Sequence, residues 1–207
     1  MSKVSIEGNS SGTGTFTIAS PNSNTNRTLN LPDQTGTLLT SATTTGFPAG
    51  SVLQVVQTVL TSTVSTSAAS IGTFVAVSGF TVSITPTSSS SKILVLLDAN
   101  MSTSSTGDQG VMYQLTRGGS AIYIGDSGGN RSRVTGVAPN LDFEFSMPKV
   151  SCVYLDSPAT TSSTTYGLGV CSTSASRTIY LNRNNNDSDN NYVGRGASSI
   201  TVMEIAA

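Results

Sequence analysis

The sequence has no histidine and no tryptophan among its 207 residues, and it has only two cysteines. The lack of histidine excludes imidazole metal ligands and every catalytic triad that uses histidine as its base. Two cysteines cannot form a four-thiolate zinc site, and they allow at most one disulfide bridge. These absences remove candidate functions without naming one, and we predict a protein without enzymatic activity and without a cofactor.

Charged residues are also scarce, at 10% of the chain against about 25% in an average soluble domain. Ten basic and eleven acidic residues leave a formal net charge of −1, so no nucleic-acid or anionic-lipid partner is expected. The first twenty residues contain no apolar stretch typical of a signal sequence or a membrane span. We expect assembly in a cytoplasm and no membrane insertion.

Hydroxyl side chains are what the sequence has in abundance, with 35 serines and 30 threonines. Even so, 36% of the residues are hydrophobic and the mean hydropathy is +0.03, which is too apolar for a disordered chain. Threonine-rich and valine-rich segments with few charges suit pleated, half-buried surfaces. The composition predicts an all-β protein.

Three regions follow one another along the chain. Residues 1–40 hold weak strand-like runs at 15–18 and 27–31, which are too few to enclose a core of their own. Residues 41–50 (SATTTGFPAG) have the composition of a linker. Strand patterns then recur at regular intervals through residues 51–207. We expect a short N-terminal segment, a linker and one β-sandwich domain.

The domain at 51–207 is predicted to be an antiparallel two-sheet sandwich of the jelly-roll type, with about eight to ten strands. The run at 92–101 is apolar on both faces, so it either lies centrally or contacts a partner subunit. The predicted strands are 52–60, 74–85 with a break at Ser78-Gly79, 92–101, 111–117, 120–125, a hairpin containing the two cysteines, 177–181 and 199–205.

Two hairpins have patterns that fix a register. A Gly-Gly turn at 118–119 accepts the positive φ angles of a tight hairpin, which pairs Leu115 with Ile122 and Tyr113 with Ile124.

In the second hairpin, pairing Val153 with Val170 puts apolar residues on one face and Cys152 directly opposite Cys171. We therefore predict neighbouring thiols, reduced in a cytoplasm and able to oxidise after lysis.

Paired acids raise the alternative of glycan hydrolysis. Asp142 and Glu144 are two residues apart in an alternating run, which places both carboxylates on one strand face at a distance that such catalysis permits. The same alternation with phenylalanine is typical of a strand with one wet face. Two interpretations therefore remain for Asp142 and Glu144, a catalytic pair of acids or the polar face of an ordinary strand.

A possible calcium loop is the weakest candidate site. Asp187, Asp189 and Asn191 offer oxygen ligands at alternate positions, as in an EF-type loop. The pattern then fails, because Tyr192 stands in the place of the required glycine and Ser198 in that of the bidentate glutamate. An asparagine-rich turn or a surface recognition loop fits the same residues, and we predict no metal site.

Polar loops at 126–135 and 182–191 are candidates for surface recognition, since loops on a rigid scaffold carry most recognition. Clustered arginines could bind acidic sugars or phosphate by paired hydrogen bonds, or could simply pair with neighbouring acids. The candidate receptor-binding residues are Arg131, Arg133, Asn184, Asn185, Asn186 and Tyr192.

Two groups of motifs resemble proteins of tailed bacteriophages. Residues 12–21 (GTGTFTIASP) and 26–39 (NRTLNLPDQTGTLL), followed by PAGSV at 48–52, are similar to a TLPDxTGTL segment that recurs in tail fibres and other virion proteins. Asn30 replaces the first threonine of that pattern. The C-terminal motifs YLDSPATT, TIYLNR and SSITVMEI resemble terminal domains of phage fibres.

The resemblance implies a homotrimeric, non-enzymatic virion appendage. Its N-terminal segment would dock to other virion proteins, and its distal domain would meet polysaccharide on the host surface. Because only about fifty residues precede the domain, a short tail fibre is favoured over a long adhesin. A capsid decoration or head-fibre protein is the alternative, and a glycan depolymerase is a third interpretation.

Overall fold

The structure is a computed structural model. The chain divides into two compact units, Met1–Leu38 and Leu39–Ala207. It describes residues 47–67, 70–104, 110–138, 144–174 and 177–207, together with scattered residues between 7 and 35.

In the first unit, the described residues form turns, bends and irregular chain. The backbone N–H of Thr25 donates to Ser23 Oγ at 3.2 Å, which closes one local turn. Thr15 and residues 17–19 lie outside any strand, so the strand predicted at 15–18 is wrong for the residues described there. The second predicted run, 27–31, lies mostly outside the described residues.

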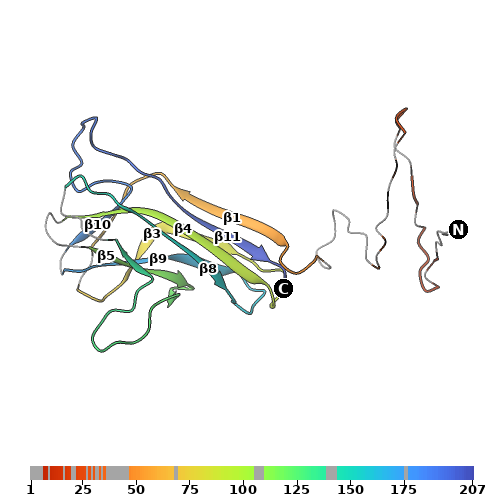
Figure 1. The fold of residues 1–207 in the computed structure, drawn as a ribbon, viewed down its shortest axis with the longest axis horizontal. Coiled ribbons are helices and arrows are strands. Elements are labelled where there is room, and N and C mark those ends of the chain that lie inside the picture. Colours follow the sequence, from red (N-terminus) through yellow and green to blue (C-terminus); the bar gives the residue numbers. More distant parts are fainter. Residues whose placement is uncertain are drawn as a thin grey trace. The chain divides into compact units, whose positions relative to one another are not determined.

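The second unit is an all-β sandwich of two antiparallel sheets, as predicted (Figure 1). The six-stranded sheet has the order β1 (Val52–Leu60), β11 (Ser198–Ile205), β4 (Lys92–Thr103), β10 (Thr178–Leu181) and β2 (Val64–Ser67), with β8 (Lys149–Asp156) also paired to β4. The five-stranded sheet has the order β3 (Val75–Ile84), β9 (Thr164–Ser172), β5 (Val111–Arg117) and β6 (Ser120–Ile122), with β7 (Gly136–Ala138) also paired to β5.

Strand β4 is central, which confirms one of the two interpretations of its apolar pattern. Over residues 93–98 it pairs with β11 on one side and with β8 on the other, and its end at 101–103 pairs with β10. Ile93, Val95 and Leu97 are buried between the sheets, whereas Leu94 and Leu96 lie half-buried on the outer face. Alternation with a period of two produces this division, because successive side chains of a strand point to opposite faces.

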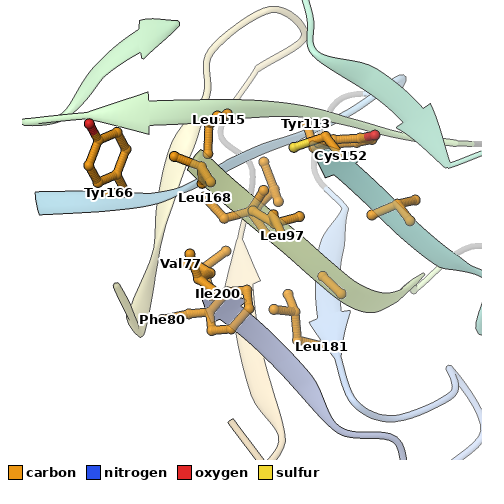
Figure 2. Close-up of a cluster of buried hydrophobic side chains, with 14 of the residues drawn as sticks. Val77, Phe80, Leu97, Tyr113, Leu115, Cys152, Tyr166, Leu168, Leu181 and Ile200 are labelled. Carbon is orange, nitrogen blue, oxygen red and sulfur yellow. The ribbon is translucent and has the colours of Figure 1, made fainter. Parts of the chain in front are cut away.

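The core lies between the two sheets, and side chains from both meet there (Figure 2). Leu97 and Ile200 come from the six-stranded sheet, and Phe80, Leu115 and Leu168 come from the five-stranded one. All five are at most 1% exposed. Such close packing of aliphatic and aromatic groups supplies most of the stability of a sandwich.

The break predicted at Ser78-Gly79 is a β-bulge in β3. Gly79 has a φ of +71°, and the pairing of β3 with β9 changes register between Ala76 and Thr81. A positive φ is accessible to glycine at little cost, which explains why Ser78-Gly79 interrupts an otherwise regular strand.

The Gly-Gly hairpin is confirmed near its turn and wrong farther away. Leu115 pairs with Ile122 as predicted. Tyr113 pairs instead with Gly136 of β7, so the predicted pairing with Ile124 is wrong. The physical reason is Tyr123, whose φ of +52° turns the chain out of the sheet directly after β6.

The two cysteines are not neighbours in a hairpin, and that prediction is wrong. Strand β8 joins the six-stranded sheet, where Cys152 is opposite Leu97. Strand β9 joins the five-stranded sheet, where Cys171 is opposite Met112. Both cysteines are free and buried.

The thiols also point in different directions. Cys152 is part of the core between the sheets. Val170 points into the core, so Cys171 points away from it, and its Sγ accepts a hydrogen bond from the backbone N–H of Gly72 at 3.2 Å. The loop after β8 therefore crosses from one sheet to the other. The sequence pattern suggested a hairpin because Val153 and Leu155 look core-facing, yet they are 60% and 52% exposed.

Candidate binding surfaces

The structure places the two arginines of the 126–135 loop differently. Arg131 donates from Nη1 to the carbonyl oxygen of Gly128 at 3.1 Å, within its own turn. Arg133 donates from Nε to the carbonyl oxygen of Gly125 at 2.7 Å, which fixes its guanidinium across the base of the loop. Both side chains are exposed, but Arg133 lines a cleft.

The asparagines of the 182–191 loop organise the loop itself. Asn184 is only 3% exposed, and its Nδ2 donates to the carbonyl oxygen of Phe145 at 2.7 Å, so its selection as a receptor contact is wrong. The Asn185 carbonyl oxygen accepts a hydrogen bond from Arg183, and the Asn186 backbone N–H donates to the carbonyl oxygen of Glu144. These two side chains are half-buried.

Tyr192 is the candidate of this loop that remains accessible. Its side chain is 63% exposed and meets the ring of Phe145 edge to face, with centroids 5.4 Å apart. The tyrosine therefore stands on the surface at the end of a loop that is otherwise internally bonded.

Asp187 pairs with arginines, a role different from that of a calcium ligand. Its Oδ2 lies 3.2 Å from Nη1 of Arg183, and its Oδ1 lies 2.6 Å from Nη2 of Arg195. Two guanidinium groups thus neutralise the carboxylate that the calcium interpretation needed. Asp189 and Asn191 are exposed. Within the described part of the chain, no group of three or more metal-ligating acids or thiols comes together.

The paired acids fall partly outside the described residues. Asp142 lies outside the described residues. Glu144 occupies a turn, so the strand predicted around these two acids does not include Glu144. The two residues are therefore not described as neighbours on one strand face.

A cleft that the sequence did not reveal lies where β6 and β8, each at the edge of its sheet, come together. Its volume is about 640 Å³, and its wall is built by the ends of β5, β6 and β8 with the following loops. The charged and aromatic groups that line it are Arg117, Tyr123, Arg133, Tyr154 and Asp156.

Two tyrosines form one wall of this cleft. The rings of Tyr123 and Tyr154 are stacked, with centroids 4.8 Å apart and an angle of 23° between the planes. Tyr123 is 49% exposed, so its ring borders solvent while Tyr154 supports it.

A half-buried ion pair between Arg117 and Asp156 also lines the cleft. Nη1 of Arg117 donates to both oxygens of Asp156 at 2.8 Å, and the hydroxyl of Tyr166 donates to Asp156 Oδ2 at 2.6 Å. Burial and the neighbouring Asp156 carboxylate raise the pKa of Tyr166 far above its ordinary value, so it remains a hydrogen-bond donor at every physiological pH. Both oxygens of the Asp156 carboxylate therefore accept hydrogen bonds within the protein.

The outer face of the six-stranded sheet carries a second distinctive surface, which we call the apolar row. Cross-strand pairing aligns four residues across β1, β11, β4 and β8, namely Val55, Met203, Leu94 and Leu155. Leu96 and Val153, which are paired beside these four residues, complete the apolar row. Val55, Val153 and Leu155 are more than half exposed.

The five-stranded sheet has the opposite character on its outer face. Ser83 and Thr165 are hydrogen-bonded there at 2.7 Å between hydroxyl oxygens, and Thr81 and Thr116 lie on the same side. Hydroxyl groups suit a face that meets water, whereas the apolar row leaves hydrocarbon exposed.

Comparison with known protein families finds no match for the sequence, and comparison with curated proteins finds no relative. Among the residues that the structure describes, no helix is long and apolar enough to cross a membrane.

Proposed function

We propose that the protein is a non-enzymatic structural protein of a tailed-bacteriophage particle. In this proposal it is a homotrimeric short tail fibre or receptor-binding appendage that attaches to glycan on the host surface. The apolar row is the observation that carries the proposal, because a water-soluble domain gains by burying such a face against another protein.

The resemblance of residues 12–39 to phage structural proteins supports the same proposal. In phage appendages of this kind, subunits associate around a symmetry axis, and a closed ring repeats one contact surface in every copy. A row of apolar residues that crosses four strands can serve as such a surface, and the row itself holds no charge that would be buried unpaired.

The buried acids of the sandwich are used to hold the fold together. Asp156 is engaged by Arg117 and Tyr166, and Glu204, which is fully buried, accepts hydrogen bonds from Gln54 and Thr87. An acid that is fully hydrogen-bonded in its charged form is a weak general base. This arrangement supports a binding or scaffolding role.

A capsid decoration protein is the second candidate, because the apolar row could equally cover a shell protein. Antibodies against the purified chain, viewed on particles by electron microscopy, separate the two. Labelling of the tail supports the appendage, and labelling over the head supports decoration. Particles that carry no label would contradict both.

The oligomeric state gives an independent test. Light scattering of the purified protein at micromolar concentration should report three times the chain mass of 21.2 kDa. A mass of one chain under these conditions would contradict a trimeric appendage.

A further inference from the structure

We infer that the cleft between β6 and β8 binds an acidic sugar, with the ring of the sugar on Tyr123 and its carboxylate on Arg133. This inference rests on the proposed attachment to glycan and deepens it, since it assigns the site and the charge of the ligand.

The tyrosine wall provides a surface for a sugar ring. A sugar has an apolar face of C–H groups and a rim of hydroxyl groups, and a tyrosine offers a matching flat apolar body with a polar tip. Tyr123 is half exposed and backed by Tyr154 at 4.8 Å, so its ring is held in place before any ligand arrives. Preorganisation of this kind lowers the entropic cost of binding.

The backbone at Tyr123 is held in an unusual conformation. Its φ of +52° is rare for a residue with a large side chain. Strained residues of this type cluster at ligand sites, and here the strain turns the aromatic ring out of β6 toward the cleft.

The charges of the cleft favour one negative charge on the ligand. Arg117 is already paired with Asp156, so these two lining groups cancel. Among the residues that the structure describes, the Arg133 side chain has a hydrogen bond only from Nε, to the Gly125 carbonyl oxygen, which leaves both terminal nitrogens for a ligand. One unneutralised guanidinium matches one carboxylate, and the pair can form two parallel hydrogen bonds.

The size of the cleft also fits a small oligosaccharide. Its volume of about 640 Å³ lies within the usual range for ligand sites, and it is open at the surface. The hydroxyl groups of Tyr123, Tyr154 and Ser157 can serve the ligand hydroxyls in addition to the arginine.

The test is binding of a galacturonic-acid trisaccharide to the full-length protein, measured by calorimetry beside the neutral galactose trisaccharide. We expect the acidic sugar to bind roughly tenfold or more tightly than the neutral one, with an affinity that falls as salt is added. Absence of binding at millimolar sugar, or equal affinity for the two sugars, would overturn the inference.

Variants locate the site. Tyr123→Ala should weaken binding of both sugars by about tenfold or more, whereas Arg133→Gln should remove the preference for the acidic one. Matched controls are Val137→Ala and Lys149→Gln, which change an exposed apolar side chain and an exposed cation outside the cleft. Both should bind like the unaltered protein. Loss of binding in the controls, or unchanged binding in Tyr123→Ala, would contradict the assignment.

These outcomes separate the inference from the proposed function. A protein that labels particle tails but ignores the acidic sugar would retain the proposed function and lose this site. A protein that binds the sugar through Tyr123 but labels no particle would retain the site and lose the phage role.

Discussion

At the scale of single residues, the two acids that the sandwich buries most deeply, Asp156 and Glu204, are surrounded by hydrogen-bond donors. Asp156 is 4% exposed and Glu204 is fully buried, in a chain with few charges overall. A buried carboxylate costs free energy unless donors replace its water, and removing one donor leaves the group underbonded. The partners of these two acids are therefore sensitive positions.

Tyr166→Phe should lower the free energy of unfolding by about 2 kcal/mol, because it removes a short hydrogen bond to the charged Asp156. Tyr113→Phe is the matched control. Its hydroxyl is 3.4 Å from the Ser151 carbonyl oxygen, so its loss should cost about 0.5 kcal/mol or less. Urea unfolding of both variants measures the difference, and equal losses would contradict the assigned role of Asp156.

Glu204 should make stability depend on pH. Burial raises the pKa of this acid, but hydrogen bonds from Gln54, Ser91 and Thr87 outweigh burial and hold the pKa below its ordinary value of 4.5. A lowered pKa contributes stability that is complete above the unfolded-state value and is lost as pH falls through the folded-state value. Stability should therefore fall below about pH 4.5.

Glu204→Gln isolates this effect. The variant should unfold at a lower temperature than the unaltered protein at pH 7, and the gap should narrow as pH falls below 4.5. Glu144→Gln, which changes an exposed glutamate in a turn, should follow the unaltered protein at each pH. Thermal unfolding followed by circular dichroism gives both curves, and a gap that stays constant with pH would argue against a charged Glu204.

Residue types alone did not identify the cleft. Tyr123 and Tyr154 are 31 positions apart, and Arg117 and Asp156 come from different sheets, so no local pattern joins them. Asn184 is predicted to bind a receptor because an asparagine-rich loop is typical of surface recognition. The sequence does not show that its amide turns inward and donates to a backbone carbonyl oxygen.

At the scale of elements, alternation and turn chemistry predicted strands well but did not assign them to sheets. Strand β1 and strand β5 have the predicted bounds, and the Gly-Gly turn sets the register of β5 with β6. The sheet to which β8 belongs depends on packing against β4, a contact between distant segments. Short strands such as β2 and β7 carry too few residues for a periodic signal.

The pairing of β7 with β5 depends on a glycine. A Cβ atom at Gly136 would lie 2.5 Å from Oη of Tyr113 and 2.7 Å from its Cζ, so the tyrosine ring occupies the space of a side chain. Gly136→Ala should therefore destabilise the domain by about 1 to 3 kcal/mol, measured by urea unfolding.

Two further variants test the cause of that loss. Gly125→Ala is the control, because a Cβ there meets nothing within 4 Å, and its effect should stay within about 0.5 kcal/mol. Replacing Tyr113 by leucine in the Gly136→Ala background should recover part of the loss, since it removes the clashing ring. A double variant that is simply additive would show that the ring is not the cause.

At the scale of the whole molecule, the outer faces of the two sheets differ in chemistry, and we expect them to have different roles. The five-stranded sheet presents hydroxyl groups, whereas the six-stranded sheet presents the apolar row. The cleft with Tyr123 lies at the edge where the sheets meet, beside β8. A subunit contact through the apolar row and a ligand in the cleft would therefore use adjacent but separate surfaces.

Substitution in the apolar row tests the subunit contact without touching the core. Val153 is 60% exposed and sits beside Leu96, so Val153→Lys should leave the fold intact while placing a charge in the contact. Its mass by light scattering should fall from three chains to one chain of 21.2 kDa. Thr81→Lys, on the exposed outer face of the other sheet, is the control and should keep the mass of three chains. A Val153→Lys protein that remains trimeric would exclude this face as the subunit contact.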